Sequence, residues 1–411
     1  MSQVVGEKQI ELKSFEMSFP MWIGFLASIS VGAICLYLIS LENANRAWLN
    51  VLIGTCIFLG LGLSGLFFLL INNLVRARWM IAMRRVFEAS AMTLPVAALL
   101  AFIVFLGRDS IFEWMDPEVV ATDPLIRMKS IYLNETFFGF RLIAVFAVFL
   151  GSSWYLVRNS LRQDHDGQLI HSTRNYVSSA IFMVLFAVSV TVVAFDLLLS
   201  LDPHWFSTIY GVYYFAAFFQ AGLAVAYLVV WYLHRRGIFA GVVNRAHFHD
   251  LGKMLFAFSV FWAYIVYSQF MLIWYADIPE ETFWYKERFE GAWHIIFWIL
   301  PVVRWALPFL ILLPYAHKTN FKIVLPVCVL ILFGHWLDFY WNAMPALRLF
   351  DHSDAAVSAA SVFDGGLIWQ EALVGLGFFS LFFVCLGLII ERIRVIPIRD
   401  PQIQNSIHHH E

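Results

Sequence analysis

The sequence contains few charged residues for a chain of its length. Only 14% of its 411 residues are Asp, Glu, Lys or Arg, and 61% are hydrophobic, whereas a typical soluble domain is about 25% charged. A water-soluble fold cannot bury so much apolar surface in one core, so lipid must solvate most of the chain. The net charge of −2, from 27 basic and 29 acidic residues, gives no indication of nucleic-acid binding.

Cysteine is also scarce. Cys35, Cys56, Cys328 and Cys385 lie far apart in the sequence, each within an apolar run. There is no CxxCH motif for covalently bound c-type haem and no cysteine cluster for an iron–sulfur centre or zinc. The cysteines are therefore interpreted as small apolar packing residues. The absence of a P-loop argues against an ATP-driven pump.

Long apolar runs dominate the sequence. A membrane-spanning helix needs about 20 apolar residues, and the chain contains enough runs of this kind to predict an all-α integral membrane protein with ten spans. We expect a polar N-terminal segment at 1–19, a membrane domain at 20–395 and a polar tail at 396–411. The predicted spans lie near 20–41, 48–75, 87–107, 137–157, 176–200, 207–233, 251–275, 292–315, 323–343 and 367–391.

Glycine and proline within these runs predict how the helices pack. The second run contains Gly60, Gly62 and Gly65, small residues that let helices approach closely in lipid. Pro95, Pro301 and Pro308 lie inside runs, where each should kink its helix and leave carbonyls to be satisfied by neighbouring helices.

Lysine and arginine are distributed unevenly between the connections. The two tails and the even-numbered loops hold 17 of these residues, and the odd-numbered loops hold 7. Cytoplasmic connections of membrane proteins are enriched in Lys and Arg, so both termini are predicted to be cytoplasmic. The opposite loops at 108–136, 276–291 and 344–366 are longer and richer in acidic residues, which suggests a docking surface for a partner.

Ionisable residues occur inside the predicted spans, where each costs a few kcal/mol or more unless it is paired. The fifth span ends with Asp196, and Asp202 and His204 follow at its outer rim. We hypothesise that these three residues form an outer half-path for protons. Asp202 precedes Pro203, so a turn that caps the next helix is the alternative for that residue.

The ninth span carries His335 and Asp338, which are three residues apart and therefore share one helix face. A carboxylate beside an imidazole fixes its tautomer, which suits proton relay. The alternative is a polar pair that only joins two helices. Haem b ligation is not expected, because His294 and His335 are predicted at different depths.

Arginine inside a span stays charged and must face a carboxylate or a wet cavity. Arg304 lies near the middle of the eighth span, where it is expected to hold a carboxylate in its charged form. Arg141 in the fourth span also requires a carboxylate partner, and Glu135 and Asp196 are the two candidates.

The seventh span begins near Lys253, which either snorkels to the interface or influences nearby carboxylates. Further along, Tyr264 and Ser268 are four residues apart and share one face, along which protons could pass with water. The distribution of these groups over the depth of the membrane fits a proton path. The predicted path comprises Asp196, Asp202, His204, Lys253, Tyr264, Ser268, Arg304, His335 and Asp338.

Three long segments resemble the NrfD/PsrC-like membrane subunits. These segments are residues 195–215, residues 249–282 and the sequence GHWLDFYWNAMP at 334–345. The resemblance extends over nearly all of residues 20–395. Within the family it points to the F subunit of bacterial alternative complex III, a quinol:cytochrome c oxidoreductase.

The resemblance implies two four-helix bundles flanked by two further helices, in a bacterial inner membrane. It also implies a multisubunit respiratory complex with a paralogous membrane subunit and with periplasmic iron–sulfur and haem c subunits that carry the electrons. This subunit would hold no metal and no redox cofactor of its own. One of the two paralogues oxidises menaquinol near the periplasmic face of its first bundle, and the other supports proton movement.

One departure from the family decides which paralogue we expect. Members that oxidise quinol use a histidine in the first bundle, whereas the first histidine of this chain is His165, in a loop. We therefore expect a subunit that supports proton translocation and energy coupling. The first alternative is a direct quinol-oxidising subunit, in which Asp196, Arg141 and Glu135 are the candidate quinone contacts.

A second alternative is an ion-coupled secondary transporter. Transporters commonly have helices that are broken at corresponding positions of two repeats. The sequence shows no pair of runs broken in this way by glycine or proline, so this alternative is disfavoured.

Overall fold

The computed structural model describes residues 2–5, 8–11, 14–350 and 367–409. Apart from a short antiparallel hairpin of β1 (Ser2–Val5) and β2 (Lys8–Glu11), the described chain is helical. It contains ten helices that are long and apolar enough to cross a membrane. The prediction of an all-α integral membrane protein with ten spans is therefore confirmed.

The observed spans agree with the predicted runs to within a few residues at most ends. The exceptions are the third, fourth, fifth, seventh and ninth spans, which are longer than their apolar runs. The spans are α1 (Phe19–Glu42), α2 (Ala44–Leu74), η1 (Trp79–Met83) with α3 (Arg84–Ala91) and α4 (Leu94–Leu106), α7 (Glu135–Asp166), α8 (Leu169–Leu197) with η4 (Leu199–Leu201), α9 (Tyr210–Arg235), α10 (Arg245–Ala276), α12 (Trp293–Pro301) with η5 (Val302–Ala306) and α13 (Leu307–Leu312), α14 (Phe321–Ala343) with η7 (Met344–Phe350), and α15 (Ile368–Arg392).

Short helices fill the connections and the C-terminal segment. They are η2 (Arg108–Ser110), η3 (Glu113–Met115), α5 (Pro117–Thr122), α6 (Pro124–Lys129), α11 (Pro279–Arg288), η6 (Tyr315–Thr319) and α16 (Ile403–Ile407).

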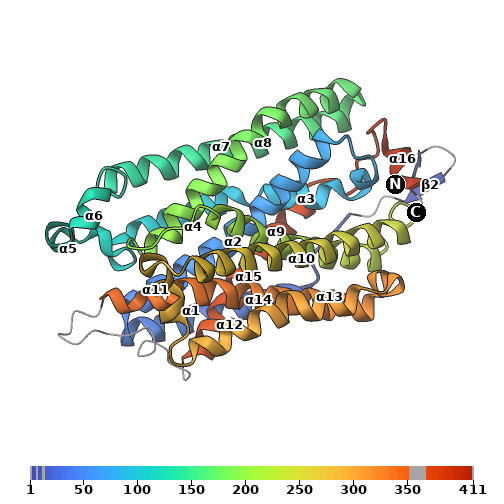
Figure 1. Ribbon diagram of the computed structural model, residues 1–411. Helices are drawn as coiled ribbons and strands as arrows, with labels where there is room; N and C mark the ends of the chain where they lie inside the picture. Colours follow the sequence, from blue (N-terminus) through green and yellow to red (C-terminus); the bar gives the residue numbers. More distant parts are fainter. Residues whose placement is uncertain (1, 6–7, 12–13, 351–366, 410–411) are drawn as a thin grey trace.

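The spans form two four-helix bundles and one additional pair. In the first bundle α2, α3 with α4, α7 and α8 pack together, and in the second bundle α9, α10, α12 with α13, and α14 pack together. The contacts of α2 and α8 with α9 join the bundles. The remaining two helices, α1 and α15, pack closely against each other and along α2 (Figure 1).

Helix α2 is the most deeply buried of the spans. Its glycines allow the neighbouring helices α9 and α3 to pack closely against it. A β-carbon placed on Gly60 would lie 2.5 Å from the Cβ of Phe218 in α9. One placed on Gly65 would lie 2.6 Å from the backbone oxygen of Phe87 in α3. The expectation that these small residues permit close helix contact is confirmed.

The three prolines lie where two spans are interrupted. Pro95 follows a break between α3 and α4. Pro301 ends α12, and Pro308 lies at the start of α13, with the π-helical segment η5 between them. Two spans are therefore interrupted near these prolines, as the kinks predicted for them led us to expect. However, one interrupted span is the second helix of its bundle and the other is the third, so the breaks do not occupy corresponding positions.

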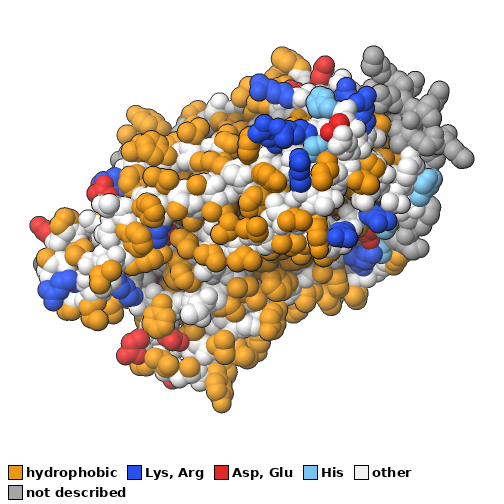
Figure 2. Space-filling model, turned by 90° about the horizontal axis from the view of Figure 1, so that it is seen from above, with side chains coloured by type: hydrophobic (Ala, Val, Ile, Leu, Met, Phe, Trp, Pro, Cys, Tyr) orange, Lys and Arg blue, Asp and Glu red, His pale blue; other side chains and the backbone are white. Residues whose placement is uncertain are grey.

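The molecule has two distinct ends, which we call the terminal end and the distal end. The terminal end carries β2 and α16, and the distal end carries α5, α6 and α11 (Figure 1). On the face shown in Figure 2, Lys, Arg and His side chains gather at the terminal end, and hydrophobic side chains cover the middle. Of the three distal loops expected to dock a partner, the one at 344–366 lies mostly outside the described residues.

The orientation in the membrane can be tested with single cysteines at the two ends. Ile131 is 86% exposed in the distal connection between α6 and α7, and Arg236 is exposed in the connection between α9 and α10 at the terminal end. Because Lys and Arg favour the cytoplasmic side, we expect a membrane-impermeant maleimide to label Ile131→Cys in intact cells. Arg236→Cys should react only after permeabilisation, and the reverse pattern would show that the terminal end faces outward.

Candidate functional site

The π-helical segment η5 places an arginine in the centre of the second bundle. Arg304 is fully buried and forms an ion pair with the carboxylate of Asp338 from α14. Its Nη2 donates to the backbone oxygen of Ala217 at 2.8 Å, and its Nε donates to Oε1 of Gln220 at 3.0 Å. The amide nitrogen of Gln220 in turn donates to the backbone oxygen of Arg304 at 2.7 Å. The predicted demand for a carboxylate beside Arg304 is thus met.

The carboxylate of Asp338 receives several hydrogen bonds besides the ion pair. The Tyr213 hydroxyl donates to Oδ1, and the indole nitrogen of Trp262 donates to Oδ2 at 3.1 Å. The side-chain amide of Asn342 donates to Oδ1 at 3.3 Å and to the Tyr213 hydroxyl at 2.6 Å. These contacts stabilise the charged form of a carboxylate that is 1% exposed.

The expected pair of His335 with Asp338 is not formed. Both nitrogens of the fully buried His335 ring lack a hydrogen-bond partner among the described residues. The ring lies against Phe339, with 4.6 Å between the ring centroids. The physical reason is that the permanent charge of Arg304, together with three donors, occupies both oxygens of Asp338.

Polar contacts continue from Asn342 to the distal end of the molecule. Nη2 of Arg288 donates to the backbone oxygen of Asn342 at 2.9 Å, and burial and the nearby Arg348 lower the pKa of Arg288 to about 10. The next residue along the chain, Glu287, lies 2.6 Å from Nη2 of Arg348. The same nitrogen donates to Asp202 at 2.8 Å. We call the chain from Arg304 through Asp338, Asn342, Arg288, Glu287 and Arg348 to Asp202 the distal polar chain.

The distal polar chain ends beside a group of acidic residues and one histidine. Nε2 of His204 lies 2.6 Å from Oδ2 of Asp123. Although burial opposes it, hydrogen bonds from the Ile126 backbone and His204 lower the pKa of Asp123. Burial raises the pKa of Glu113, which lies close enough to His204 and Asp202 for their charges to affect it. Asp202 and His204 therefore belong to one polar region, although they bind different partners.

The alternative role of Asp202 as a helix cap is not observed. The residue before the first turn of α9 is Ile209, and the Asp202 side chain binds Arg348.

Asp196 belongs to a separate site in the first bundle. Nε of Arg141 donates to Oδ2 of Asp196 at 2.8 Å, and Nη1 donates to the backbone oxygen of Tyr132 at 2.7 Å. Burial and the charge of Asp196 raise the pKa of Tyr132 to about 12. Glu135 pairs with Arg108 at 2.7 Å. Of the two partners proposed for Arg141, the structure therefore selects Asp196.

The grouping of Asp196 with Asp202 and His204 in one half-path is thus corrected. No hydrogen bond or ion pair in the described part of the chain joins Asp196 to Asp202. Asp202 is instead connected, through Arg348, to the second bundle. The sequence did not indicate this because the connecting arginine lies more than 140 residues away, in η7.

The remaining predicted path residues lie apart from the distal polar chain. Lys253 is about half exposed and pairs with Asp250 at 2.5 Å. His409 of the C-terminal segment binds the same carboxylate at 2.6 Å. Tyr264 is 63% exposed, and Ser268 is half-buried on the same helix. The structure does not bring these residues together with Asp338.

Two further buried ion-pair clusters lie outside the second bundle. Nε of Arg46 donates to Glu371 at 2.8 Å, between α2 and α15. At the terminal end, Arg85 forms ion pairs with Glu88 and Asp164. The third span was predicted to begin near residue 87, which left Arg85 in the preceding connection, so this cluster was missed.

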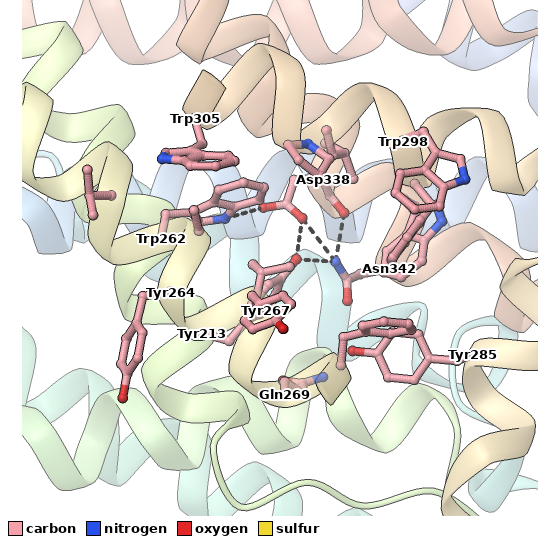
Figure 3. Close-up of a pocket in the computed structure, with 18 of the residues that line it drawn as sticks. Tyr213, Trp262, Tyr264, Tyr267, Gln269, Tyr285, Trp298, Trp305, Asp338 and Asn342 are labelled. Atoms are coloured by element: carbon pink, nitrogen blue, oxygen red, sulfur yellow. Dashed lines mark hydrogen bonds between the residues drawn. The ribbon is translucent and has the colours of Figure 1, made fainter. Parts of the chain in front are cut away.

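A cavity of about 610 Å³ opens beside Asp338, between α10, α11, α12 with η5, and α14. Its polar wall consists of Tyr213, Asp338 and Asn342, as Figure 3 shows. Tyr264 and Trp298 lie on its exposed side, and most of the remaining lining is aromatic or aliphatic. The cavity was not predicted, because its lining comes from segments that are distant in sequence.

No family model matches this chain, and no curated protein is significantly similar to it.

Proposed function

We propose that the chain is an NrfD/PsrC-like membrane subunit of a bacterial quinol:cytochrome c oxidoreductase of the alternative complex III type. In this proposal it supports proton translocation across the inner membrane, while partner subunits with iron–sulfur clusters and c-type haems carry the electrons. The sequence segments described above and the arrangement of two bundles with two flanking helices support the assignment. The distal polar chain is the single observation that carries the role in proton transfer.

The chemistry of the distal polar chain suits the storage and transfer of protons. Asp338 pairs with Arg304 inside the second bundle, and Glu287 and Asp202 both pair with Arg348. Each carboxylate lies beside an arginine. It can therefore alternate between a charged form that is paired with the arginine and a protonated form, while the neighbouring side chains move little. Burial raises the pKa of Glu287, and Arg348 opposes this effect. Water can bridge neighbouring carboxylates in such a chain.

The proposed path is a half-path that serves the distal side. From Gln220, a hydrogen bond of 2.9 Å leads to Ser259, whose hydroxyl donates to the backbone of its own helix. Among the described residues, the Ser259 side chain forms no further hydrogen bond that would continue the path toward the terminal end. With the terminal end in the cytoplasm, the half-path would exchange protons with the periplasm.

A second candidate function is direct quinol oxidation in the first bundle. One observation favours it: Oδ1 of Asp196 and Nη2 of Arg141 are buried and lack hydrogen-bond partners among the described residues. An acceptor and a donor placed in this way could bind the hydroxyl groups of a quinol. In this case Asp196 would also accept a proton.

The proposal is tested by the number of protons moved per electron in vesicles that contain the purified complex. We expect the complex with Asp338→Asn to oxidise quinol but to move fewer protons per electron. The amide cannot carry a proton, so proton transfer through this position should slow by about 10²-fold or more. Glu287→Gln should lower the ratio as well, with less effect on stability, because Arg348 keeps Asp202 as its partner. The matched control is Glu371→Gln, a buried carboxylate outside the distal polar chain, which should leave the ratio unchanged.

Two results would overturn the assignment of the path. An unchanged ratio in both Asp338→Asn and Glu287→Gln would reject proton transfer through this chain. Loss of quinol oxidation in Asp196→Asn, together with normal behaviour of Asp338→Asn, would favour the quinol-oxidising alternative.

A further inference from the structure

A second cavity lies at the distal end of the molecule, between the end of α10 and the short helix α11 (Figure 1). Its volume of about 280 Å³ is slightly below the range of about 300–1,000 Å³ that is usual for sites of drug-sized ligands. A cavity of this size suits a small polar group, such as the headgroup of a lipid. A group that fills it contacts side chains from both helices.

Each of the two helices lines this cavity with one face. The lining residues follow the spacing i, i+3, i+4, i+7 on each helix, and residues with this spacing share a helix face. Asp277 ends α10 with a φ of 46°, a left-handed conformation that Asp adopts more readily than most residues. The lining residues are Phe270, Ile273, Trp274 and Asp277 at the end of α10, and Thr282, Tyr285, Lys286 and Phe289 along α11.

The cavity wall carries one charge of each sign, and the two charges are not paired with each other. Asp277 and Lys286 are both exposed, and neither side chain forms an ion pair or a hydrogen bond within the described part of the chain. A ligand with only a negative charge would be repelled by the carboxylate, and a ligand with only a positive charge would be repelled by the lysine. Charge complementarity therefore favours a ligand that carries one group of each sign.

The cavity wall also contains a buried hydroxyl group without a partner. Thr282 is 6% exposed, and its Oγ1 has no hydrogen-bond partner among the described residues. Threonine in a helix populates two χ1 rotamers, so a rotation about this bond can present the hydroxyl group to the cavity. Thr282 and Lys286 are four residues apart and share one face of α11. Together they suit a phosphate group, which accepts hydrogen bonds from a hydroxyl and from an ammonium group.

The carboxylate of Asp277 suits a primary ammonium group. Such a group donates charge-assisted hydrogen bonds to a carboxylate, whereas a quaternary ammonium group has no N–H to donate and is typically bound in a cage of aromatic rings. In this cavity the rings of Tyr285 and Phe289 both pack on Phe270, with centroid distances of 5.3 and 6.1 Å. The three rings therefore form one aromatic wall and not a cage.

The surroundings of the cavity indicate that its ligand is a lipid. Trp274 lines the cavity and is 66% exposed, and its neighbours Leu272 and Tyr275 are 58% and 84% exposed. These side chains lie at the end of a membrane-spanning helix, where Trp and Tyr occupy the level of the lipid headgroups. A headgroup in the cavity would leave its acyl chains beside the exposed apolar side chains of α10.

We infer that this cavity binds the headgroup of a phosphatidylethanolamine-like phospholipid. The phosphate group accepts hydrogen bonds from Thr282 and Lys286, the ammonium group donates to Asp277, and the acyl chains remain in the membrane. The inference goes beyond the proposed function, because none of the cavity residues belongs to the distal polar chain and binding requires no electron or proton transfer.

The test measures lipid binding to the purified full-length protein in detergent by native mass spectrometry. The probes are the dioleoyl forms of phosphatidylethanolamine, phosphatidylglycerol and phosphatidylcholine, which have identical acyl chains. We expect phosphatidylethanolamine to bind about tenfold more tightly than the other two, because it alone combines a phosphate with a positively charged N–H donor. The inference is overturned if phosphatidylethanolamine binds no more tightly than either of the other lipids.

Substitutions assign the two charged contacts. Asp277→Asn keeps a residue that tolerates the left-handed conformation. It should weaken binding of phosphatidylethanolamine about tenfold and leave phosphatidylglycerol, which has no ammonium group, unchanged. Lys286→Gln should weaken binding of all three lipids, because each contains a phosphate. A preference for phosphatidylethanolamine that survives in Asp277→Asn, or unchanged binding in Lys286→Gln, would refute the inference.

Two further variants complete the set. Thr282→Val replaces the hydroxyl group by a methyl group and should weaken binding of all three lipids several-fold, because the phosphate loses one donor. The matched control Lys322→Gln removes an exposed lysine at the start of α14, outside the cavity, and should bind all three lipids like the wild type.

A soluble competitor identifies the source of the headgroup. Glycerophosphoethanolamine carries the same phosphate and ammonium groups but has no acyl chains. If the ligand is a lipid, this competitor should displace phosphatidylethanolamine only at a concentration about 100-fold higher or more, because it gains nothing from burial of apolar chains. Displacement at equal concentration would show that the cavity binds a soluble zwitterion and would overturn the assignment to a lipid.

Discussion

Replacement of Arg304 by methionine is expected to lower the free energy of unfolding by about 3–5 kcal/mol, the usual cost of breaking a buried ion pair. The change leaves the buried carboxylate of Asp338 without its counter-ion. It also removes the donors to Gln220 and to the backbone of Ala217. The carboxylate keeps Tyr213 and Trp262 as donors, but neutral donors do not replace a positive charge.

Chemical unfolding of the purified protein in detergent measures this loss. The control Lys253→Met removes an ion pair with Asp250 whose lysine is 52% exposed, and it should cost no more than about 1 kcal/mol. The double variant Arg304→Met with Asp338→Leu should recover most of the stability, because removing both charges eliminates the cost of an unpaired buried ion. Equal losses in the single and double variants would mean that the pair itself is not the cause.

The number of spans and the need for a partner beside Arg304 could be predicted from the sequence, because both follow from the cost of polar groups in lipid. The identity of the partner could not. Asp338 and Arg304 come from different spans, and their contact depends on how far each helix is rotated and how deep it lies. His335 is closer to Asp338 in the sequence than Arg304 is, and it shares the helix face of Asp338. Nevertheless, the carboxylate binds Arg304 and not His335.

Hydropathy also misplaced the charged residues near the ends of spans. The third span was predicted to begin near residue 87, but it begins at Trp79. Arg84 and Arg85 lie within it because Glu88, Asp164 and Asp400 neutralise them. A hydropathy pattern counts each charge as if it were exposed to water, so it ends a span where an ion pair in fact permits burial.

The same limitation explains why three residues of the distal polar chain were missed. Glu287, Arg288 and Arg348 lie in connections that were interpreted as water-exposed loops. In the structure Arg288 is 1% exposed and Arg348 is 8% exposed. Their burial arises because α11 and η7 pack onto the ends of the spanning helices, an arrangement that no periodicity in the sequence reveals.

Substitution of Gly65 by leucine is expected to cost about 3 kcal/mol of stability or to prevent folding, a severe case of overpacking. A β-carbon at this position would lie 2.6 Å from the backbone oxygen of Phe87 and 2.8 Å from the backbone nitrogen of Ala91. Because these atoms are backbone, a side-chain rotation cannot make room, and α3 would have to move away from α2. Such a shift would also disturb Glu88 on α3, which pairs with Arg85.

The matched control is Gly151→Leu in α7, where no atom lies within 4 Å of the added β-carbon. Leucine favours the helix over glycine by up to about 1 kcal/mol, so this variant should be as stable as the wild type or slightly more stable. Thermal unfolding of both variants in the same detergent separates the effect of helix propensity from that of helix contact. If Gly65→Leu unfolded at the wild-type temperature, α2 and α3 could not be as close as the structure places them, and the packing of α2 within the first bundle would have to be revised.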